Sequence, residues 1–473
     1  MKSIPSNLTS SNPREIALAV LGNFRRRDTD ATRLLHDLLK RGEVRGADAR
    51  LATELALGIL RQRSRLDDTL SKMTRRAWYR TPPIVCDILR LGAYQLMFMD
   101  RIPAHAAVNE SVELAHRWTT RGQAATVNAI LRRLAQEREQ ELQSADSQPS
   151  QVADRETVAV ESSDSTRWPV TYSHPPWLIS YLLSCYPADE VEAFLEWNNR
   201  TPNLMLRTNR LRITAEQLAD RLKSESYEVG RIGWPTPESV ELRGVVGDVG
   251  GAAWFTEGLA TVQDGAAQLV VHLLSPRPGE RIADWCAGPG GKSSHMAEIS
   301  DDRARILALD VDANRLAAVA LHAQRLGLQS VRTYPLRPEL IEWLSQEPAD
   351  AVLVDAPCTG LGTIQRHPDI RWRRNSKDIE RSARLQLEIL DAAAHCVRTG
   401  GRLIYCACTL GPNENGDVVS QFLERHPQFE RVELSYPTDP VVSPFLDERG
   451  DLRTWPPKHQ IDGFFAARLM RAK

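Results

Sequence analysis

Hydrophobic residues recur at every third or fourth position through much of the first 140 residues of the 473-residue chain. This spacing places apolar side chains on one face of a helix, so it predicts an all-helical region. We expect helices over residues 15–24, 32–40, 47–61, 84–99, 108–117 and 126–136. The pair Pro82-Pro83 marks a helix start, because proline fits a first turn that needs no amide donor.

The helical pattern stops over residues 141–169, where Ser, Gln, Thr and acidic residues dominate. Six acidic residues stand against two arginines between positions 141 and 168, and large apolar residues are scarce. Such a stretch cannot bury a core, so it predicts a flexible linker. Residues 170–260 then mix short apolar runs with an alternating segment at 204–211, which predicts a small α+β region.

From residue 261 to the end, apolar strands alternate with helical segments. Strands are expected at 281–285 and 306–310, a glycine-rich loop follows the first of them, and a helix is expected at 315–326. This order predicts a doubly wound, Rossmann-like α/β domain. The predicted fold class is therefore multidomain: residues 1–140 helical, 141–169 linker, 170–260 α+β and 261–473 α/β.

Two later strands each lead into a cysteine. The apolar run 351–354 precedes Asp355 and Cys358, and the run 403–405 precedes Cys406 and Cys408. Ligands of open α/β sheets bind beyond the carboxyl ends of the strands, so we expect these groups to share a site. A thiolate there would act as a nucleophile, and Asp355 as an acid or hydrogen-bond donor.

Charge and cysteine content narrow the class of protein. The net charge is -1, but residues 1–140 carry 24 Lys and Arg against 15 Asp and Glu. A local basic excess is typical of a protein that binds a polyanion such as RNA. Seven cysteines in a chain of this size do not suggest a disulfide framework. We expect no signal peptide, no membrane span and a reducing, cytoplasmic location.

The glycine-rich loop follows the strand at 281–285 and consists of Cys286, Ala287, Gly288, Pro289, Gly290, Gly291 and Lys292. A Walker loop would need glycine at position 286, and a dinucleotide fingerprint would need glycine at position 293, which is Ser293. S-adenosylmethionine (SAM) is a third option because it carries no pyrophosphate. Asp310 ends the next strand, where an acid can accept both ribose hydroxyls.

Several of these motifs together resemble one family. Segments 89–95, 101–110 and 127–133 resemble the NusB-like amino-terminal domain of bacterial ribosomal RNA cytosine methyltransferases of the RsmB type, also called Sun or Fmu. The run 284–292 resembles their SAM motif, and segments 355–358 and 405–409 resemble their two cysteine motifs. One departure is that the stretch 331–337 lacks the acid that family members carry near the end of the third strand, beside the adenine.

The resemblance implies methylation of carbon 5 of a specific cytosine in 16S ribosomal RNA, with SAM as methyl donor. It implies that Cys408 attacks the base, forming a covalent bond to carbon 6, and that Cys358 assists product release. It also implies that SAM contacts residues 286–292, Asp310 and Asp355. We expect a monomer, and we expect Lys292 to contact the methionine carboxylate.

Other residues are candidates for RNA contacts. They are Arg207, Asn209 and Arg210, the arginines at 25–27 and 132–133, and the loop 363–374, in which Trp372 stands among cationic side chains. Stacking of a base on an aromatic ring beside a phosphate-binding cation is a common mode of RNA recognition. For each of these residues an ordinary solvated or packed position is the competing interpretation.

Two alternative functions stay open. A transfer RNA cytosine methyltransferase would share the catalytic motifs, although the NusB-like segment favours ribosomal RNA. A non-catalytic RNA-binding or antitermination factor could retain the fold without activity. Intact Cys408, Asp355 and glycine loop favour an enzyme, and SAM binding distinguishes the two classes.

Overall fold

The computed structural model describes residues 4–24, 30–74, 77–146, 165–244, 249–432 and 440–472. The chain forms two compact units. The first comprises Met1–Leu183 together with His367–Arg373, and the second comprises Ser184–Arg366 together with Arg374–Lys473. Among the helices of the described residues, none is both long and apolar enough to cross a lipid bilayer.

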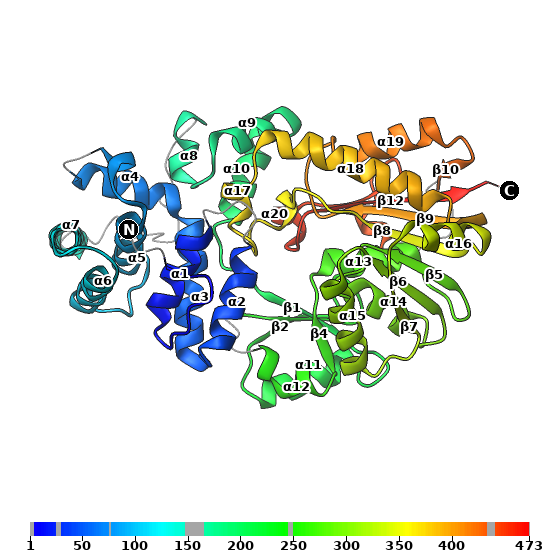
Figure 1. Cartoon of the computed structure of the whole chain (residues 1–473), viewed down its shortest axis with the longest axis horizontal. Helices are drawn as coiled ribbons and strands as arrows, with labels where there is room; N and C mark the ends of the chain where they lie inside the picture. The colour runs from blue at the N-terminus through cyan, green and yellow to red at the C-terminus, as the bar shows by residue number, and fades with distance from the viewer. Residues whose placement is uncertain are drawn as a thin grey trace. The chain divides into compact units, whose positions relative to one another are not determined.

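The first unit is helical (Figure 1). Its helices are α1 (Pro13–Phe24), α2 (Ala31–Arg41), α3 (Gly46–Arg61), α4 (Arg63–Met73), α5 (Pro83–Phe98), α6 (Ala104–Trp118), α7 (Arg121–Asp146), α8 (Trp168–Thr171), most of α9 (Pro176–Cys185) and the short α17 (Ile370–Arg373). Every helix predicted in residues 1–140 is present. The structure adds helix α4. The sequence pattern did not predict this helix because only two of its residues, Leu66 and Leu70, are buried.

Part of the predicted linker is helical. Helix α7 continues to Asp146, and a 3-10 turn at Ser165–Arg167 leads directly into α8. Residues 141–146 and 165–169, expected to be flexible, therefore lie in helical segments. The rest of the predicted linker, 147–164, lies outside the described residues.

A small antiparallel sheet opens the second unit. Its strands are β1 (Leu204–Thr208), β2 (Val229–Ile232), β3 (Ser239–Leu242) and β4 (Ala260–Val262), in the order β2-β3-β1-β4. Helix α11 (Ala215–Ser224) has a Thr214 capping box and buries Leu218 and Leu222 in the same apolar cluster as β1 and β3. Helix α10 (Ala188–Trp197) precedes β1 in the chain, and α12 (Ala253–Thr256) lies between β3 and β4.

The large sheet of the second unit has eight strands. They are β5 (Arg281–Trp285), β6 (Arg305–Asp310), β7 (Val331–Pro335), β8 (Ala349–Asp355), β9 (Val397–Ala407), β10 (Phe429–Arg431), β11 (Leu452–Thr454) and β12 (Phe464–Arg471). The order is β10-β12-β9-β8-β5-β6-β7, with β11 paired to β12. Strands β5 to β9 run parallel and β12 runs antiparallel to β9.

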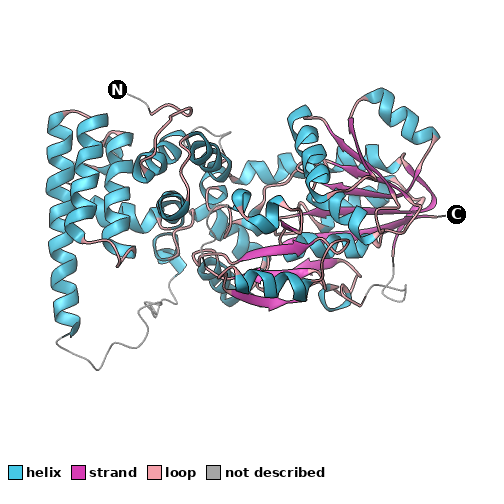
Figure 2. Cartoon of the chain, turned by 90° about the horizontal axis from the view of Figure 1, so that it is seen from below, coloured by secondary structure: helices cyan, strands magenta, loops and turns pink. Residues whose placement is uncertain are grey.

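Helices cover both faces of this sheet (Figure 2). On one face, α13 (Gly265–Leu274) and α14 (Gly291–Ile299) share a core with Leu353 of β8. On the other, α16 (Pro338–Gln346), α18 (Ser376–Ala394) and α19 (Gly416–Arg425) share a core with Val352. Successive residues of a strand point to opposite faces, so the two cores alternate along β8. The fold class predicted from the sequence is confirmed.

The small sheet is joined to the large domain by a set of ionisable side chains that we call the buried cluster: Arg207, Glu238, His272, His295 and Glu298. Arg207 of β1 donates to Glu298 of α14 at 2.8 and 3.0 Å, and both side chains are at most 1% exposed. Glu238 accepts from His272 at 2.8 Å and from His295 at 2.6 Å. Because it is desolvated and paired, this cluster fixes the small sheet against α13 and α14.

Candidate active site

The carboxyl ends of β5, β8 and β9 lie side by side. The chain moves outward from β5 through β6 and β7 and then returns to the other side of β5 with β8 and β9. Ligands of open α/β sheets bind at this reversal of strand order. Cys286, Asp355 and Cys408 follow or end these three strands.

The two predicted thiols meet at this edge. The Sγ atoms of Cys358 and Cys408 lie 3.3 Å apart, and both side chains are half-buried. The hydrogen bond with Cys408 and then burial raise the pKa of the Cys358 thiol well above its usual value. Cys358 therefore keeps its proton near neutral pH and can donate a hydrogen bond to a Cys408 thiolate.

Asp355 and Lys292 form an ion pair beside the thiols. The Nζ atom of Lys292 lies 2.7 Å from Oδ2 of Asp355, and the lysine side chain is 11% exposed. Burial alone would lower the pKa of Lys292, but the Asp355 carboxylate outweighs it and raises this pKa above its usual value. Lys292, which was expected to contact a methionine carboxylate, has Asp355 as its partner in this structure.

The extra thiol, Cys406, is fully buried and its Sγ lies 3.4 Å from Oδ1 of Asp355. Burial and then the charge of Asp355 raise its pKa well above the usual value, so it remains a neutral thiol. Cys86 and Cys396 are also buried. Cys185 is only half-buried at the end of α9.

The glycine loop has the close packing that a ligand cradle needs. A Cβ atom on Gly288 would lie 2.4 Å from Cβ of Arg315, and Gly290 has a φ of 106°. Oδ2 of Asp310 accepts from the amide of Gly288 at 3.2 Å, which brings the acid of β6 against the loop. Burial raises the pKa of Cys286 to about 12, so this thiol is not a nucleophile at neutral pH. A glycine loop with an acid at the end of the next strand fits a ligand that carries a ribose.

Comparison with known proteins shows the same three parts. The profile of the family "16S rRNA methyltransferase RsmB/F" matches residues 271–470. The NusB family matches residues 11–136, and the ferredoxin-like domain of RsmF/B-like methyltransferases matches residues 174–246. A probable ribosomal RNA small subunit methyltransferase B of a Synechocystis species is 34% identical over 97% of this chain and 99% of its own. The chain belongs to the RsmB/F family of SAM-dependent rRNA methyltransferases.

Further relatives agree with this membership. The ribosomal RNA small subunit methyltransferase B of an Escherichia coli strain is 33% identical, covering 91% of this chain and 92% of its own. The crystal structure of PH0851 superposes with a TM-score of 0.76 at 27% identity, covering 99% of this chain and 100% of that one. The family resemblance drawn from the motifs is confirmed, and the ferredoxin-like match covers much of the small α+β region.

A buried carboxylate that the sequence did not single out holds the two cysteine loops together. Glu414 is fully buried and accepts from the amide of Thr359 at 2.9 Å and from Gln386 at 3.0 Å. It also accepts from the hydroxyl of Thr359, which lies 2.7 Å from the hydroxyl of Thr409. Thr359 follows Cys358 and Thr409 follows Cys408, so this clamp sets the spacing of the thiols.

Two of the predicted RNA contacts on β1 and its turn are not available in this structure. Arg207 is fully buried in the buried cluster. Asn209 is also fully buried and donates to the carbonyls of Gly258 and Leu326. Arg210 is exposed and remains a candidate. The burial of Arg207 depends on Glu298, 91 residues away, which no local pattern reveals.

The loop 363–374 is also engaged internally. Arg366 pairs with Asp264 at 2.7 Å and with Asp462 at 3.1 Å. Within the first unit, the fully buried Arg371 donates to the carbonyls of Arg61 and Ser173, and Trp372 donates to Leu60. The interpretation of these three side chains as phosphate and base contacts is therefore wrong for this conformation.

The basic surface of the first unit is partly described. Arg132 is exposed and bonded to Asn128, and Arg133 is exposed and paired with Glu137 at 2.8 Å. Exposed pairs of this kind exchange readily with other anions, since they contribute little to stability. The arginines at 25–27 lie outside the described residues.

Proposed function

We propose that the protein transfers a methyl group from SAM to carbon 5 of a cytosine in 16S ribosomal RNA, through a covalent bond between Cys408 and carbon 6 of the base. The observation that carries this proposal is the pair of thiols 3.3 Å apart at the ends of adjacent parallel strands, next to Asp355 and Lys292. One thiol alone would be more consistent with packing. Family membership and the names of the relatives support rRNA as the substrate.

Carbon 5 of cytosine is a weak nucleophile, and addition of a thiolate to carbon 6 activates it. The Cys408 sulfur forms the new bond to carbon 6, the ring double bond shifts its electrons toward nitrogen 3, and nitrogen 3 takes a proton. When bound, SAM supplies an electrophilic methyl group on a sulfonium sulfur, and carbon 5 takes this methyl as the carbon–sulfur bond breaks. Loss of the carbon 5 proton then releases Cys408 as a thiolate and restores the ring.

Asp355 is the proposed group at nitrogen 3. Its Oδ2 accepts from the Lys292 ammonium, so the pair can deliver a proton or a charged hydrogen bond to the ring and take it back at the end. The low exposure of Lys292 strengthens this interaction, because little water screens it.

Cys358 is proposed to act on the second half of the reaction. Its raised pKa keeps a proton on its sulfur, so the Cys358 thiol can donate a hydrogen bond to the Cys408 sulfur, 3.3 Å away. A water molecule oriented by Cys358 can accept the proton of carbon 5. Removal of Cys358 is then expected to slow release more than attack.

SAM is proposed to lie along the loop 286–292 with its ribose at Asp310 and its methyl end toward Asp355. The glycines permit close approach of the backbone, and the carboxylate of Asp310 sits at the end of β6 where a ribose can reach it. The missing acid at 331–337 leaves adenine to be held by backbone and apolar contacts. The helical first unit and the small sheet are proposed to bind RNA, and the protein to act in the cytoplasm as a monomer.

The alternative functions differ in their substrate or in catalysis. A transfer RNA methyltransferase would use the same thiols, and a non-catalytic RNA-binding factor would use none. The Cys358–Cys408 pair and the Asp355–Lys292 pair favour an enzyme, because a factor without activity has no need for reactive groups in an accessible site.

The proposal is tested with unmodified 16S rRNA and SAM. Methylation by the unaltered protein is mapped by bisulfite sequencing, which detects 5-methylcytosine, and transfer RNA is assayed in parallel. Cys408→Ala and Cys408→Ser are expected to lower methylation by at least about a thousandfold, because the nucleophile is lost. Full activity of Cys408→Ala, or methylation at an atom other than carbon 5, would contradict the proposal.

A further inference from the structure

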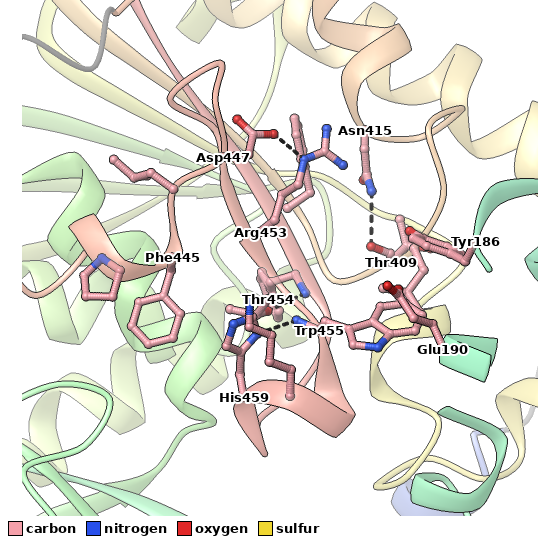
Figure 3. Close-up of a pocket in the computed structure, with 16 residues that line it drawn as sticks. Tyr186, Glu190, Thr409, Asn415, Phe445, Asp447, Arg453, Thr454, Trp455 and His459 are labelled. Carbon is pink, nitrogen blue, oxygen red and sulfur yellow. Dashed lines mark hydrogen bonds and ion pairs between the residues drawn. The ribbon is translucent and has the colours of Figure 1, made fainter. Parts of the chain in front are cut away.

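A cavity of about 340 Å³ lies in the second unit (Figure 3). Thr409 and Leu410 line it and directly follow Cys408 in the chain. Phe464 lines it as well, and the Nζ atom of Lys292 lies 5.2 Å from the centre of this ring. The cavity therefore shares a wall residue, Phe464, with the surroundings of Lys292, and it lies in the volume range of small-ligand sites.

Aromatic rings form one side of the cavity. Trp455 is half-buried and packs on Tyr186 with ring centroids 4.6 Å apart and on Phe194 at 5.3 Å. Tyr186 is itself fixed by the amide of Gly411, which donates to its hydroxyl at 3.1 Å. Trp455 is thus a rigid aromatic surface at the wall of the cavity, and flat heterocycles stack on such surfaces.

Asn415 adds a polar group to a wall that also contains apolar side chains such as Phe445 and Leu446. The side-chain nitrogen of Asn415 donates to the carbonyl of Thr409 at 3.3 Å, whereas its Oδ1 atom is buried without a hydrogen-bond partner among the described residues. Asn415 is 3% exposed. A buried acceptor left unsatisfied costs free energy, so a ligand with an amino or ring N–H group would be favoured at this wall.

His459 offers a donor at the same cavity. Its Nδ1 atom accepts from the amide of Trp455 at 2.7 Å, which leaves a hydrogen on Nε2. Burial, and then Lys458, lower the pKa of His459 below its usual value, so the ring is neutral at pH 7. The cavity therefore presents both an acceptor and a neutral donor, as the edge of a nucleobase requires.

The charges at the cavity balance. Arg453 pairs with Asp447 at 2.5 Å, and Glu190 is a second acid in the lining. Lys458 is exposed, and no carboxylate of the described residues lies within ion-pair distance of it. A site for a free anion would carry a net positive charge. This lining fits an uncharged ring with a single phosphate placed near Lys458.

We propose that this cavity binds a nucleotide of the RNA substrate adjacent in sequence to the target cytosine. Its base stacks on Trp455 with its polar edge toward Asn415 and His459, and its phosphate lies near Lys458. This assignment rests on the function proposed above. It gives the enzyme a means to recognise the sequence next to the methylated base, because Thr409 connects the cavity wall to Cys408 along the chain.

The first test compares steady-state methylation of unmodified 16S rRNA by single variants. Trp455→Ala is expected to raise KM for RNA about tenfold, which corresponds to about 1.4 kcal/mol and is typical of the loss of one stacked base. Trp455→Phe, which keeps an aromatic ring, should restore most of the affinity. Lys458→Ala, an exposed change that does not disturb packing, should raise KM about threefold by loss of one phosphate contact. The kcat and the dissociation constant of SAM should stay unchanged in all three.

Arg303→Ala is the control, because Arg303 is also exposed but lies before the amino end of β6, whereas the thiols lie at the carboxyl ends of the strands. Unchanged KM for both Trp455→Ala and Lys458→Ala would overturn the proposal. So would an increase for Arg303→Ala as large as that for Lys458→Ala, since it would indicate a nonspecific charge effect.

A second test locates the nucleotide directly. 4-Thiouridine is placed at the position before or after the cytosine mapped by bisulfite sequencing, and irradiation is expected to crosslink one of these positions to the peptide containing Trp455. The absence of a crosslink from both positions would overturn the proposal. Retained methylation by the unaltered protein in the same assays would show that the proposed function stands even if this inference fails. If the unaltered protein does not methylate 16S rRNA in these assays, the proposed function itself is rejected.

Discussion

The second unit holds two groups of interacting charged and nucleophilic side chains that differ in access to solvent. The buried cluster around Arg207 and Glu298 is at most 1% exposed at that ion pair. We call Cys358, Cys408, Asp355 and Lys292 the thiol cluster, in which Asp355 is 31% exposed and both thiols are half-buried. Both groups contain strongly shifted pKa values, such as that of His295, lowered to about 3 by burial, and that of Lys292.

The difference shows that a shifted pKa alone does not identify a catalytic site. In the buried cluster the polar atoms form hydrogen bonds with one another. These bonds fix the small sheet against the large domain. In the thiol cluster the same kinds of groups end parallel strands and remain within reach of a ligand. Access at a strand end, combined with a nucleophile, is what favours catalysis.

The largest effect is expected from a substitution that breaks the buried cluster. Arg207→Met leaves the Glu298 carboxylate buried and without its cation, and this should lower the free energy of unfolding by about 3–5 kcal/mol. Urea unfolding monitored by tryptophan fluorescence measures it. Arg221→Met is the matched control, because the Arg221–Glu257 pair is far more exposed and should cost at most about 1 kcal/mol. Weakened RNA binding by Arg207→Met without loss of stability would show that Arg207 contacts RNA instead.

The second-largest effect is expected at Glu414, which holds the two loops of the thiol cluster together. Glu414→Ala removes the acceptor for Thr359 and should lower stability by about 1–3 kcal/mol. It should also lower kcat by about a hundredfold, because the thiols lose their fixed spacing. Glu414→Gln keeps one acceptor and should fall between. Glu424→Ala, an exposed change on helix α19, which begins two residues after Glu414, serves as control, and equal activities of the Glu414→Ala and Glu424→Ala variants would reject the clamp.

Acid should weaken the buried cluster through His295. Burial lowers the pKa of His295 from 6.5 to about 3, so between these values the unfolded chain binds a proton that the folded chain does not. Stability therefore falls as pH drops below about 6.5, by about 2 kcal/mol at pH 5 from this residue. Thermal unfolding from pH 7 to 5 measures the slope. His295→Gln should flatten it, and an unchanged slope would contradict this assignment.

The smallest effect concerns the extra thiol. Cys406→Ala removes a buried sulfur and should cost about 1 kcal/mol of stability while leaving methylation unchanged. Radiolabelled methyl transfer to 16S rRNA at saturating SAM is the measurement. A loss of activity as large as that of Cys408→Ala would mean that Cys406, and not Cys408, is the nucleophile.

The local patterns predicted what depends on neighbouring residues. Periodicity gave the helices of residues 1–140, and the strand ends placed Cys358, Asp355 and Cys408 at one edge because parallel strands share their direction. The sequence did not reveal the fate of Arg371 or the role of Glu414. Arg371 is bonded to a carbonyl 310 residues away, and Glu414 to an amide 55 residues away. Such partners are set by tertiary packing, which no local spacing encodes.

The departures at Arg207 and Trp372 have the same cause. Both were predicted to contact RNA because exposed cations and aromatic rings bind RNA. In the structure their N–H groups instead donate to acceptors inside the protein. The cavity beside Thr409 was likewise invisible, since its walls come from α20 (Pro456–His459), the loop before it and the turn after α9. Alternation and motif spacing describe strands and loops but not the space between them.

Covalent trapping tests the role of Cys408 most directly. Labelled 16S rRNA is incubated with SAM and the Cys358→Ala variant, and the products are separated on a denaturing gel. A slowly migrating protein–RNA band is expected for Cys358→Ala, because release is impaired after Cys408 has attacked the base. No such band is expected when Cys408 is also replaced by alanine. A band that persists in the double variant would contradict the assignment of Cys408 as the nucleophile.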